Sequence, residues 1–274
     1  MSQLLALFLD RLAHAPAVLV SITRSEGSVP RAPGTWMAVF AQATVGTIGG
    51  GQLEWSAQQQ ARERLAADGG EAWVQSVVLG PSLGQCCGGR LQLRFEPVTA
   101  ADRSALRQRL RQPQQPVGLF GGGHVGRALV QALAPLPYAV HWIDSRDEVF
   151  PDDVPAHVTT EHSAPVQAAV NGLPAGAHVL IMSFSHAEDL DIVAACLRRQ
   201  RERADLRWVG LIGSRTKWAS FRHRLADRGF TPAELAGVTC PIGLPGITDK
   251  APAVIAAAVV AQLLLFDAQR SPGD

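Results

Sequence analysis

The feature that most constrains the fold is a glycine-rich turn between a strand and a helix in the second half of the chain. The segment GLFGGGHVGRALV places Gly121, Gly123 and Gly126 in a G-x-G-x-x-G spacing. It follows an apolar run of strand length and opens a helical pattern, the context in which this spacing predicts a phosphate-binding turn. Glycines there let a pyrophosphate approach the free N–H groups of the helix start. The alternative is that they only allow the helix to pack closely on the strand.

The segments around this turn alternate between strand and helix patterns. Apolar runs of strand length lie at 116–120, 138–144, 177–185 and 207–213, and helical patterns lie at 124–134, 187–200, 214–228 and 249–267. Continuous apolar strands separated by helices are typical of a parallel sheet that is buried on both faces. The second half is therefore predicted to be a Rossmann-like parallel-sheet domain.

The first half predicts a small α+β domain. A helix is expected at 2–14, strands at 17–23, near 35–40, at 71–79 and at 90–97, and a further helix after the glycines at 49–51. The segment 99–116 is polar and basic and contains two prolines, which favours a short helix and a linker. The predicted class is α/β, with an N-terminal domain at 1–98, a linker at 99–116 and a Rossmann-like domain at 117–274.

Charge and cysteine usage restrict the classes of partner. The net charge of +1 indicates no basic face for nucleic acid. Four cysteines do not form a disulfide framework, which favours a reducing, cytoplasmic compartment. The N-terminus has no basic leader, and the longest apolar run, AVIAAAVVAQLLLFDA, is short for a bilayer span and contains Gln262. We expect a buried helix there and no membrane association.

Several residues of the second half are expected along one edge of the sheet, where open α/β folds bind ligands. Asp144 lies 18 residues after Gly126, where a ribose-binding carboxylate belongs, and Arg146 could instead accommodate an extra phosphate. Ser214 is a good helix N-cap, and Arg215 and Lys217 in the next turn suggest an anion to meet them. The other candidate ligand-binding side chains at helix starts are His124 and His186.

Two motifs of the first half also favour a bound ligand. The segment GTIGGGQLEW presents Gly49, Gly50 and Gly51 at a helix start, with Glu54 in the first turn. These glycine N–H groups suit an anion, and Glu54 either favours the helix dipole or accepts hydrogen bonds from a ligand. A plain turn is the alternative.

The segment GPSLGQCCGGR carries two adjacent thiols. Arg90 and the N–H groups of Gly88 and Gly89 would lower a cysteine pKa if they point inward. Neighbours in an extended segment face opposite sides, so one thiol should face the ligand and the other the core. We assign Cys87 to the ligand and Cys86 to the core.

The motifs in order, GSVPRAPGTWM, GTIGGGQLE, GQCCGG, FGGGHVG, WIDSR, SHAEDLD, GLIGSRTK and CPIGL, resemble those of the xanthine dehydrogenase accessory factor family, the XdhC/CoxI type. The resemblance runs from about residue 15 to 266. It implies an N-terminal domain joined to a Rossmann-like domain. It also implies a protein that binds molybdenum cofactor, protects it during sulfuration and delivers it to a molybdenum hydroxylase such as xanthine dehydrogenase. A cysteine desulfurase partner and a homodimer or larger assembly are implied as well.

The family motifs fall on particular positions of this chain. The CGG motif matches Cys87, Gly88 and Gly89, and the GGG-x-x-E motif matches Gly49, Gly50, Gly51 and Glu54. The S-x-P-R motif matches Ser28, Pro30 and Arg31. The usual Thr-His pair reads Ser185 and His186, and Val254 stands where the family's last motif often has a glutamate, so a role for that carboxylate is not carried over.

The residues and the resemblance lead to one functional expectation with rivals. A molybdenum cofactor binder needs donors for a phosphate, partners for a pterin and a soft thiolate near the metal, and Cys87 is the candidate for a transient molybdenum contact. One rival is an NAD(P)-dependent oxidoreductase, since the glycine motif and Asp144 fit a nicotinamide cofactor. The others are a sulfur transferase with a persulfide on Cys87 and a regulatory nucleotide sensor. The first expectation is a non-catalytic chaperone.

Overall fold

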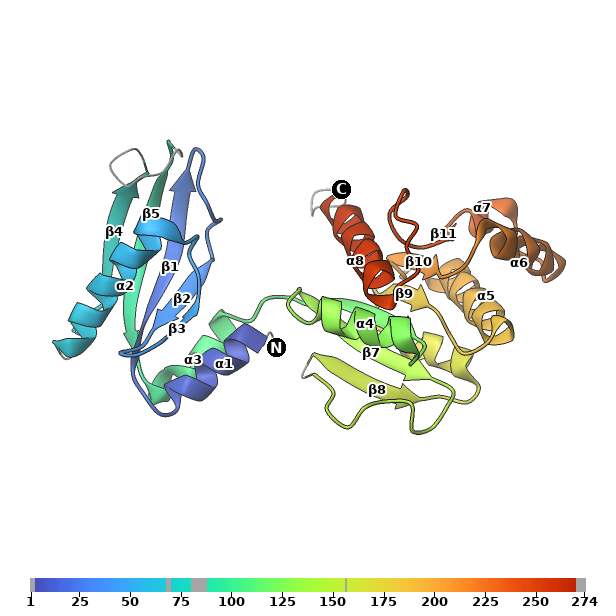
Figure 1. The fold of residues 1–274 in the computed structure, drawn as a ribbon, viewed down its shortest axis with the longest axis horizontal. Helices are drawn as coiled ribbons and strands as arrows, with labels where there is room; N and C mark the ends of the chain where they lie inside the picture. The colour runs from blue at the N-terminus through green and yellow to red at the C-terminus, as the bar shows by residue number, and fades with distance from the viewer. Residues whose placement is uncertain (1–2, 68–69, 80–87, 156, 270–274) are drawn as a thin grey trace. The chain divides into compact units, whose positions relative to one another are not determined.

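The protein divides into two compact units, Gln3–Arg111 and Gln112–Asp274 (Figure 1). The computed structural model describes residues 3–67, 70–79, 88–155 and 157–269. The first unit holds an antiparallel sheet with helices, and the second a parallel sheet with helices on both faces. The predicted fold class is therefore confirmed. The division between the units lies inside the segment 99–116.

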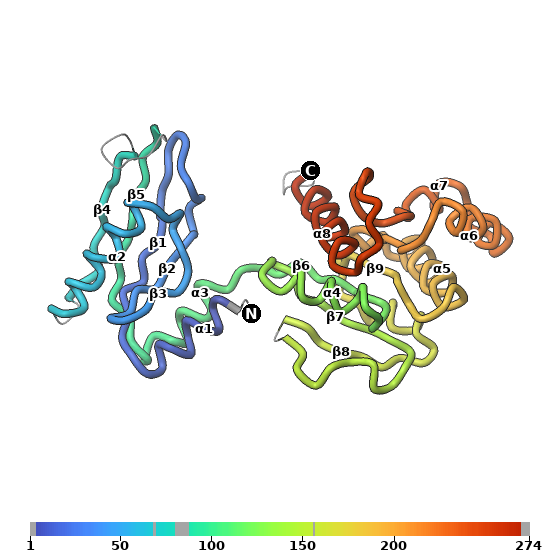
Figure 2. The backbone as a smooth tube through the Cα atoms, viewed as in Figure 1, coloured from blue at the N-terminus to red at the C-terminus, as the bar shows by residue number. Residues whose placement is uncertain are grey.

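The first unit is built on a five-stranded sheet in the order β3-β2-β1-β5-β4, with every neighbouring pair antiparallel. Figure 2 follows its chain from β1 through the 27–35 connection into β2. Its elements in chain order are α1 (Gln3–Leu12), β1 (Ala17–Glu26), β2 (Trp36–Val39), β3 (Thr44–Gly46), α2 (Gly51–Ala66), β4 (Trp73–Val78), β5 (Arg90–Val98), the 3-10 helix η2 (Ala100–Asp102) and α3 (Arg103–Arg109).

Both faces of this sheet carry a core because side chains alternate along β1 and β5. Val18 and Val20 of β1 face α2, where they pack with Leu53. Leu19, between them, faces the opposite side and packs with α1 and α3. The buried residues of α1 recur at the spacing of one helix face, at Leu5, Phe8, Leu9 and Leu12. The segment after β5 thus belongs to the first unit, since Leu106 of α3 lies in the α1 core.

The second unit holds a six-stranded parallel sheet in the order β8-β7-β6-β9-β10-β11. In chain order this is 3-2-1-4-5-6, the doubly wound order of dinucleotide-binding folds. Its elements are β6 (Gln115–Phe120), α4 (His124–Leu133), β7 (Tyr138–Asp144), β8 (Val158–His162), the 3-10 helix η3 (Val166–Gly172), β9 (His178–Ile181), α5 (His186–Arg203), β10 (Trp208–Leu211), α6 (Arg215–Asp227), α7 (Pro232–Leu235), β11 (Val238–Thr239) and α8 (Pro252–Gln269).

Helices cover both faces of the parallel sheet (Figure 1). One face packs against α4 and α8, and the other against η3, α5 and α6. All residues of β9 and β10 are buried, which explains their continuous apolar runs. The chain connections from β6 and β9 run in opposite directions along the sheet. A ligand-binding crevice is therefore expected at the carboxyl ends of these two strands.

The structure corrects some element boundaries. The strand expected at 177–185 ends at Ile181, because Ser183 and Ser185 are used in the turn that starts α5. The strands β3, β8 and β11 had no clear sequence signal. The first and last are very short, and β8 is an edge strand with a largely polar sequence.

Helix α8 was expected to be too short for a bilayer span. Over Pro252–Gln269 it is long and apolar enough to cross a membrane by length and composition alone. In the structure Ala256, Val259 and Leu263 are buried in the core against the sheet and α4. The apolar run therefore serves at least partly as core, whereas Leu264 and Leu265 are exposed.

Candidate functional site

Three motifs that are distant in the sequence meet in the first unit. A Cβ atom built on Gly49 would lie 2.8 Å from Cβ of Pro30, and one on Gly89 would collide with the carbonyl oxygen of Ser28. A Cβ atom built on Gly27 would lie 3.3 Å from the Cα atom of Gly89. We call this meeting point the loop cluster, made of residues 27–31, 47–54 and 88–89. A side chain at Gly49 or Gly89 would force its neighbour to shift, whereas a Cβ on Gly50 or Gly88 would meet nothing within 4 Å.

Glu54 holds one wall of the loop cluster in place. Its Oε2 atom accepts hydrogen bonds from the Thr47 hydroxyl at 2.5 Å and from the N–H groups of Ile48 and Gly50, both at 3.0 Å. The Gly49 N–H donates to the Thr47 hydroxyl at 3.1 Å. Burial raises the pKa of Glu54, but the Thr47 and backbone hydrogen bonds outweigh it and lower the pKa overall. The Oε2 atom thus closes the loop, while Oε1 accepts only a 3.4 Å hydrogen bond from Nε2 of Gln58 among the described residues.

The loop cluster carries an exposed cation, Arg31, and Trp55, the residue that follows the cluster in α2, is 57% exposed. Gly50, the N-cap of α2, has no side chain, and no side-chain cap bonds the start of α2 within the described residues. Cys86 and Cys87 lie outside the described residues. Arg90 is exposed and begins β5, opposite Glu26 of β1 and Val78 of β4.

The glycine turn of the second unit lies at the carboxyl end of β6, and its three glycines have different surroundings. Gly121 has a φ of 124°, and a Cβ there would overlap the carbonyl oxygen of Met182. A Cβ on Gly126 would overlap the carbonyl oxygen of Gly121. A Cβ on Gly123, by contrast, would meet nothing within 4 Å. Gly121 and Gly126 are therefore required by the fold, and Gly123 leaves open space at the start of α4.

Asp144 lies at the carboxyl end of β7, next to this turn, and is 2% exposed. Its Oδ2 accepts from the Gly122 N–H at 2.6 Å and from Nη2 of Arg146 at 2.9 Å. Its Oδ1 accepts from the N–H and Nε of Arg146, both at 2.9 Å. Burial raises the pKa of Asp144, but the bonds from Arg146 and Gly122 lower it overall. Asp144 and Arg146 thus bind each other, and a ligand contact by either one stays a prediction.

The remaining predicted residues lie at the starts of α4, α5 and α6. Ser185 caps α5 and Ser214 caps α6, each accepting a backbone N–H with its hydroxyl. Lys217 already has an anion, because its Nζ lies 2.6 Å from Oδ2 of buried Asp189 and 2.9 Å from the carbonyl oxygen of Ile212. His124, His186 and Arg215 begin their helices with exposed side chains.

The structure also brings in residues that the sequence motifs did not single out. Thr47 bonds Glu54, and Trp55 lies beside it. In the second unit the Ser145 hydroxyl donates to Oε1 of Glu188 at 2.6 Å. Phe184 is 66% exposed, and the Arg146 guanidinium lies 4.6 Å from its ring centre. The signal that could have found Phe184 is a large aromatic residue just before a helix start in a predicted Rossmann-like sheet, three residues after the end of β9.

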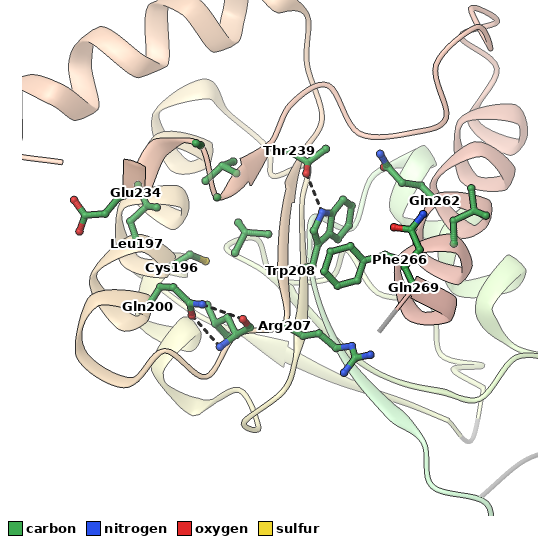
Figure 3. A pocket seen from close by; sticks show the side chains of 16 residues that line it. Cys196, Leu197, Gln200, Arg207, Trp208, Glu234, Thr239, Gln262, Phe266 and Gln269 are labelled. Atoms are coloured by element: carbon green, nitrogen blue, oxygen red, sulfur yellow. Dashed lines mark hydrogen bonds between the residues drawn. The ribbon is translucent and has the colours of Figure 1, made fainter. Parts of the chain in front are cut away.

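A cavity of about 570 Å³ lies elsewhere in the second unit, beside the amino end of β10 (Figure 3). Trp208, Phe266 and Gln262 line one side of it, and Cys196 and Gln200 the other. Burial raises the pKa of the Cys196 thiol to about 12, so this thiol stays protonated. None of the predicted site residues lines this cavity. Within the described part of the chain, no group of three or more His, Cys, Asp or Glu side chains is arranged to hold a metal ion.

Comparisons with known proteins match both units. Residues 117–263 match the XdhC Rossmann domain, and residues 11–77 match the XdhC and CoxI family. The crystal structure of a protein described as a xanthine dehydrogenase from Bacillus halodurans has a TM-score of 0.78 and 19% identity, covering 99% of this chain and 97% of that one. At this identity the likeness establishes the fold. The uncharacterized protein YqeB of Escherichia coli (strain K12) is 26% identical over 264 residues, 92% of this chain and 43% of that protein. The chain thus spans less than half the length of this relative.

Proposed function

Because the chain belongs to the XdhC and CoxI family, we propose that it is an accessory factor of xanthine dehydrogenase maturation. In this role it binds molybdenum cofactor as cargo, protects it during sulfuration and delivers it to xanthine dehydrogenase. It works in the cytoplasm as a homodimer or larger assembly, receives sulfur from a cysteine desulfurase and is not itself a catalyst. The observation that carries the proposal is the meeting of three family motifs in the loop cluster.

The loop cluster suits the chemistry of this cargo. The cargo has a phosphate, a flat pterin and a metal held by sulfur. Arg31 and the N–H groups at the start of α2 can bind a phosphate, and Trp55 offers a ring on which a pterin can stack. Glu54 keeps the loop rigid, so that these groups are positioned before the cargo arrives. Cys87 supplies the soft contact to the metal and Cys86 faces the core in this proposal, with Gly88, Gly89 and Arg90 shaping their surroundings.

The second unit supports the binding of a phosphorylated ligand. The start of α4 has no side-chain cap, and Gly123 leaves space there, so its N–H groups can hold a phosphate. The starts of α5 and α6 are instead closed by Ser185 and Ser214. The ligand at this crevice is either the phosphorylated end of the cargo or NAD(P). An NAD(P)-dependent oxidoreductase is the second candidate function, favoured by the 3-2-1-4-5-6 strand order.

The test is analysis of protein purified from a host that makes molybdenum cofactor. We expect bound molybdenum and a pterin that becomes fluorescent on oxidation, with neither present after expression in a host that lacks cofactor synthesis. Arg31→Ala should reduce retained cofactor about tenfold, because charge-assisted bonds to phosphate contribute roughly 1.5–3 kcal/mol. Arg107→Ala, at an exposed position of α3, is the control and should leave it unchanged.

The thiols are compared in the same assay. Cys87→Ala should lower cofactor retention more than Cys86→Ala, and equal retention in the two variants would refute the assignment of their roles. A protein that carries neither molybdenum nor pterin but oxidises NAD(P)H with some substrate would instead be an oxidoreductase.

A further inference from the structure

The carboxylate expected to bind a ligand in the second unit has no acceptor site left. Asp144 receives four hydrogen bonds, three from Arg146 and one from the Gly122 N–H. An ionised carboxylate offers about four lone-pair sites. A ligand hydroxyl at Asp144 would therefore have to displace Arg146 or break the bond that shapes the glycine turn.

Glu188, in the first turn of α5, differs from Asp144 because one of its carboxylate oxygens has no hydrogen-bond donor among the described residues. Its Oε1 atom is held by the Ser145 hydroxyl at 2.6 Å. Its Oε2 atom is buried and, across the described residues, accepts no hydrogen bond. A buried carboxylate oxygen without a donor is destabilising, and such groups mark places where a donor from outside the chain is expected.

Glu188 also lies at the right place in the sheet. Ser145 follows β7, and Glu188 follows β9, while β6 lies between these two strands. The Ser145–Glu188 bond therefore crosses the carboxyl end of β6, where the glycine turn begins. This is the point at which the strand order reverses and ligands of doubly wound sheets bind.

The other groups at this crevice define the class of ligand. Gly123 and the uncapped start of α4 offer space and N–H groups to a phosphate. Phe184, exposed and stacked with Arg146, offers a surface for a flat ring. Oε2 of Glu188 lacks a donor among the described residues, which favours a ligand with hydroxyl or amino donors over one with a second phosphate there.

We propose that Glu188, rather than Asp144, accepts hydrogen bonds from the ligand of the second unit, on the basis of the phosphorylated ligand proposed above. The ligand carries a phosphate that binds at the start of α4, and sugar hydroxyls or ring N–H groups that donate to Oε2 of Glu188. A dinucleotide and a pterin phosphate share this chemistry. Ser145 is a positioning residue, since it orients the carboxylate through Oε1.

Binding of two fluorescent probes, NADH and neopterin monophosphate, tests the role of Glu188. We expect at least one probe to bind the wild-type full chain and Glu188→Gln to weaken that binding about tenfold, as for a lost hydrogen bond to a charged group. Glu202→Gln, at an exposed position of the same helix, is the matched control and should bind like wild type. The probe that binds identifies the ligand as nucleotide or pterin.

A second variant distinguishes weaker binding from unfolding of the protein. Ser145→Ala removes only the orienting hydroxyl and should weaken binding about threefold with an unchanged Tm. The proposal is overturned if Glu188→Gln and Ser145→Ala bind as wild type does, or if neither probe binds the wild-type chain. Such a result does not affect the proposed function, which fails only if molybdenum and pterin are absent from the purified protein.

Discussion

At the scale of single residues, the loop cluster depends on one carboxylate. Glu54 accepts hydrogen bonds from the Thr47 hydroxyl and from two backbone N–H groups of the glycine turn. The turn has positive φ angles at Gly49, Gly50 and Gly51, so its backbone cannot form an ordinary helix start. Glu54 satisfies the N–H groups that this unusual path leaves without helical partners.

We predict that Glu54→Ala lowers the free energy of unfolding of the first unit by about 2 kcal/mol, because it leaves two backbone donors and the Thr47 hydroxyl without their acceptor. Urea unfolding measures this change. Glu63→Ala, at an exposed position of the same helix, should cost much less. Equal losses in the two variants would show that the loop does not depend on the carboxylate.

The same bonds predict a pH dependence. Hydrogen bonds lower the pKa of Glu54 below its ordinary value of 4.5 in the folded state. A carboxylate with a lowered folded pKa stabilises the protein above the unfolded pKa, and this stability is lost as the pH falls through the folded pKa. The stability difference between wild type and Glu54→Gln should therefore be full at pH 7 and shrink below about pH 4.5. A difference that stays constant down to pH 3 would contradict this.

At the scale of elements, the glycines of the β6–α4 turn have different roles: some are needed for the fold and one leaves space for a ligand. Gly126 lies against the carbonyl oxygen of Gly121, whereas Gly123 faces open space and has an ordinary φ of −72°. The two glycines belong to one motif but are required for different reasons. A side chain on Gly126 must push α4 away from β6, and one on Gly123 occupies only the space left for a ligand.

We predict opposite effects for two alanine variants of this turn. Gly126→Ala should lower Tm strongly, because overpacking a close contact costs about 1–3 kcal/mol or more. Gly123→Ala should lower stability by no more than about 1 kcal/mol, the usual cost of alanine at a helix N-cap, yet weaken binding of a phosphorylated ligand. Thermal unfolding and probe titration on the same samples check both. Normal probe binding by Gly123→Ala would show that no phosphate approaches the start of α4.

At the scale of the whole molecule, each unit has its own core. The first unit packs α2 on one face of its sheet and α1 with α3 on the other. The second unit packs α4 and α8 on one face of the parallel sheet and η3, α5 and α6 on the other. Both units are within the size range of independently folding domains.

We predict that residues 1–111 and 112–274, expressed separately, each unfold cooperatively. Neither fragment loses a core residue at this division, since every core cluster lies within one unit. Circular dichroism during urea unfolding should give one sigmoidal transition for each fragment. Division at residue 98 is the control, because it removes Leu106 from the α1 core and should destabilise the first fragment. A fragment 1–111 without a cooperative transition would contradict this.

The sequence predicted the class of each half and most of its long elements. The strand at 138–144 and the helix starts near 124, 187 and 214 agree with β7, α4, α5 and α6. These patterns are local, since they depend on hydrophobic periodicity, glycine turns and N-caps within a few residues. The edge strands β8 and β11 were missed because pairing with a neighbour, rather than any apolar run, makes them strands.

By itself, the sequence determined which chemical groups stand at the helix starts and which motifs mark the family. Only the tertiary structure decided which of these groups are free to meet a ligand. Asp144 is saturated by Arg146 and Gly122, and Lys217 is held by Asp189. Glu188 keeps one acceptor atom without a donor among the residues that the structure describes. The physical reason is that a side chain has a limited number of hydrogen-bonding sites, and residues distant in the sequence compete for them once the chain has folded.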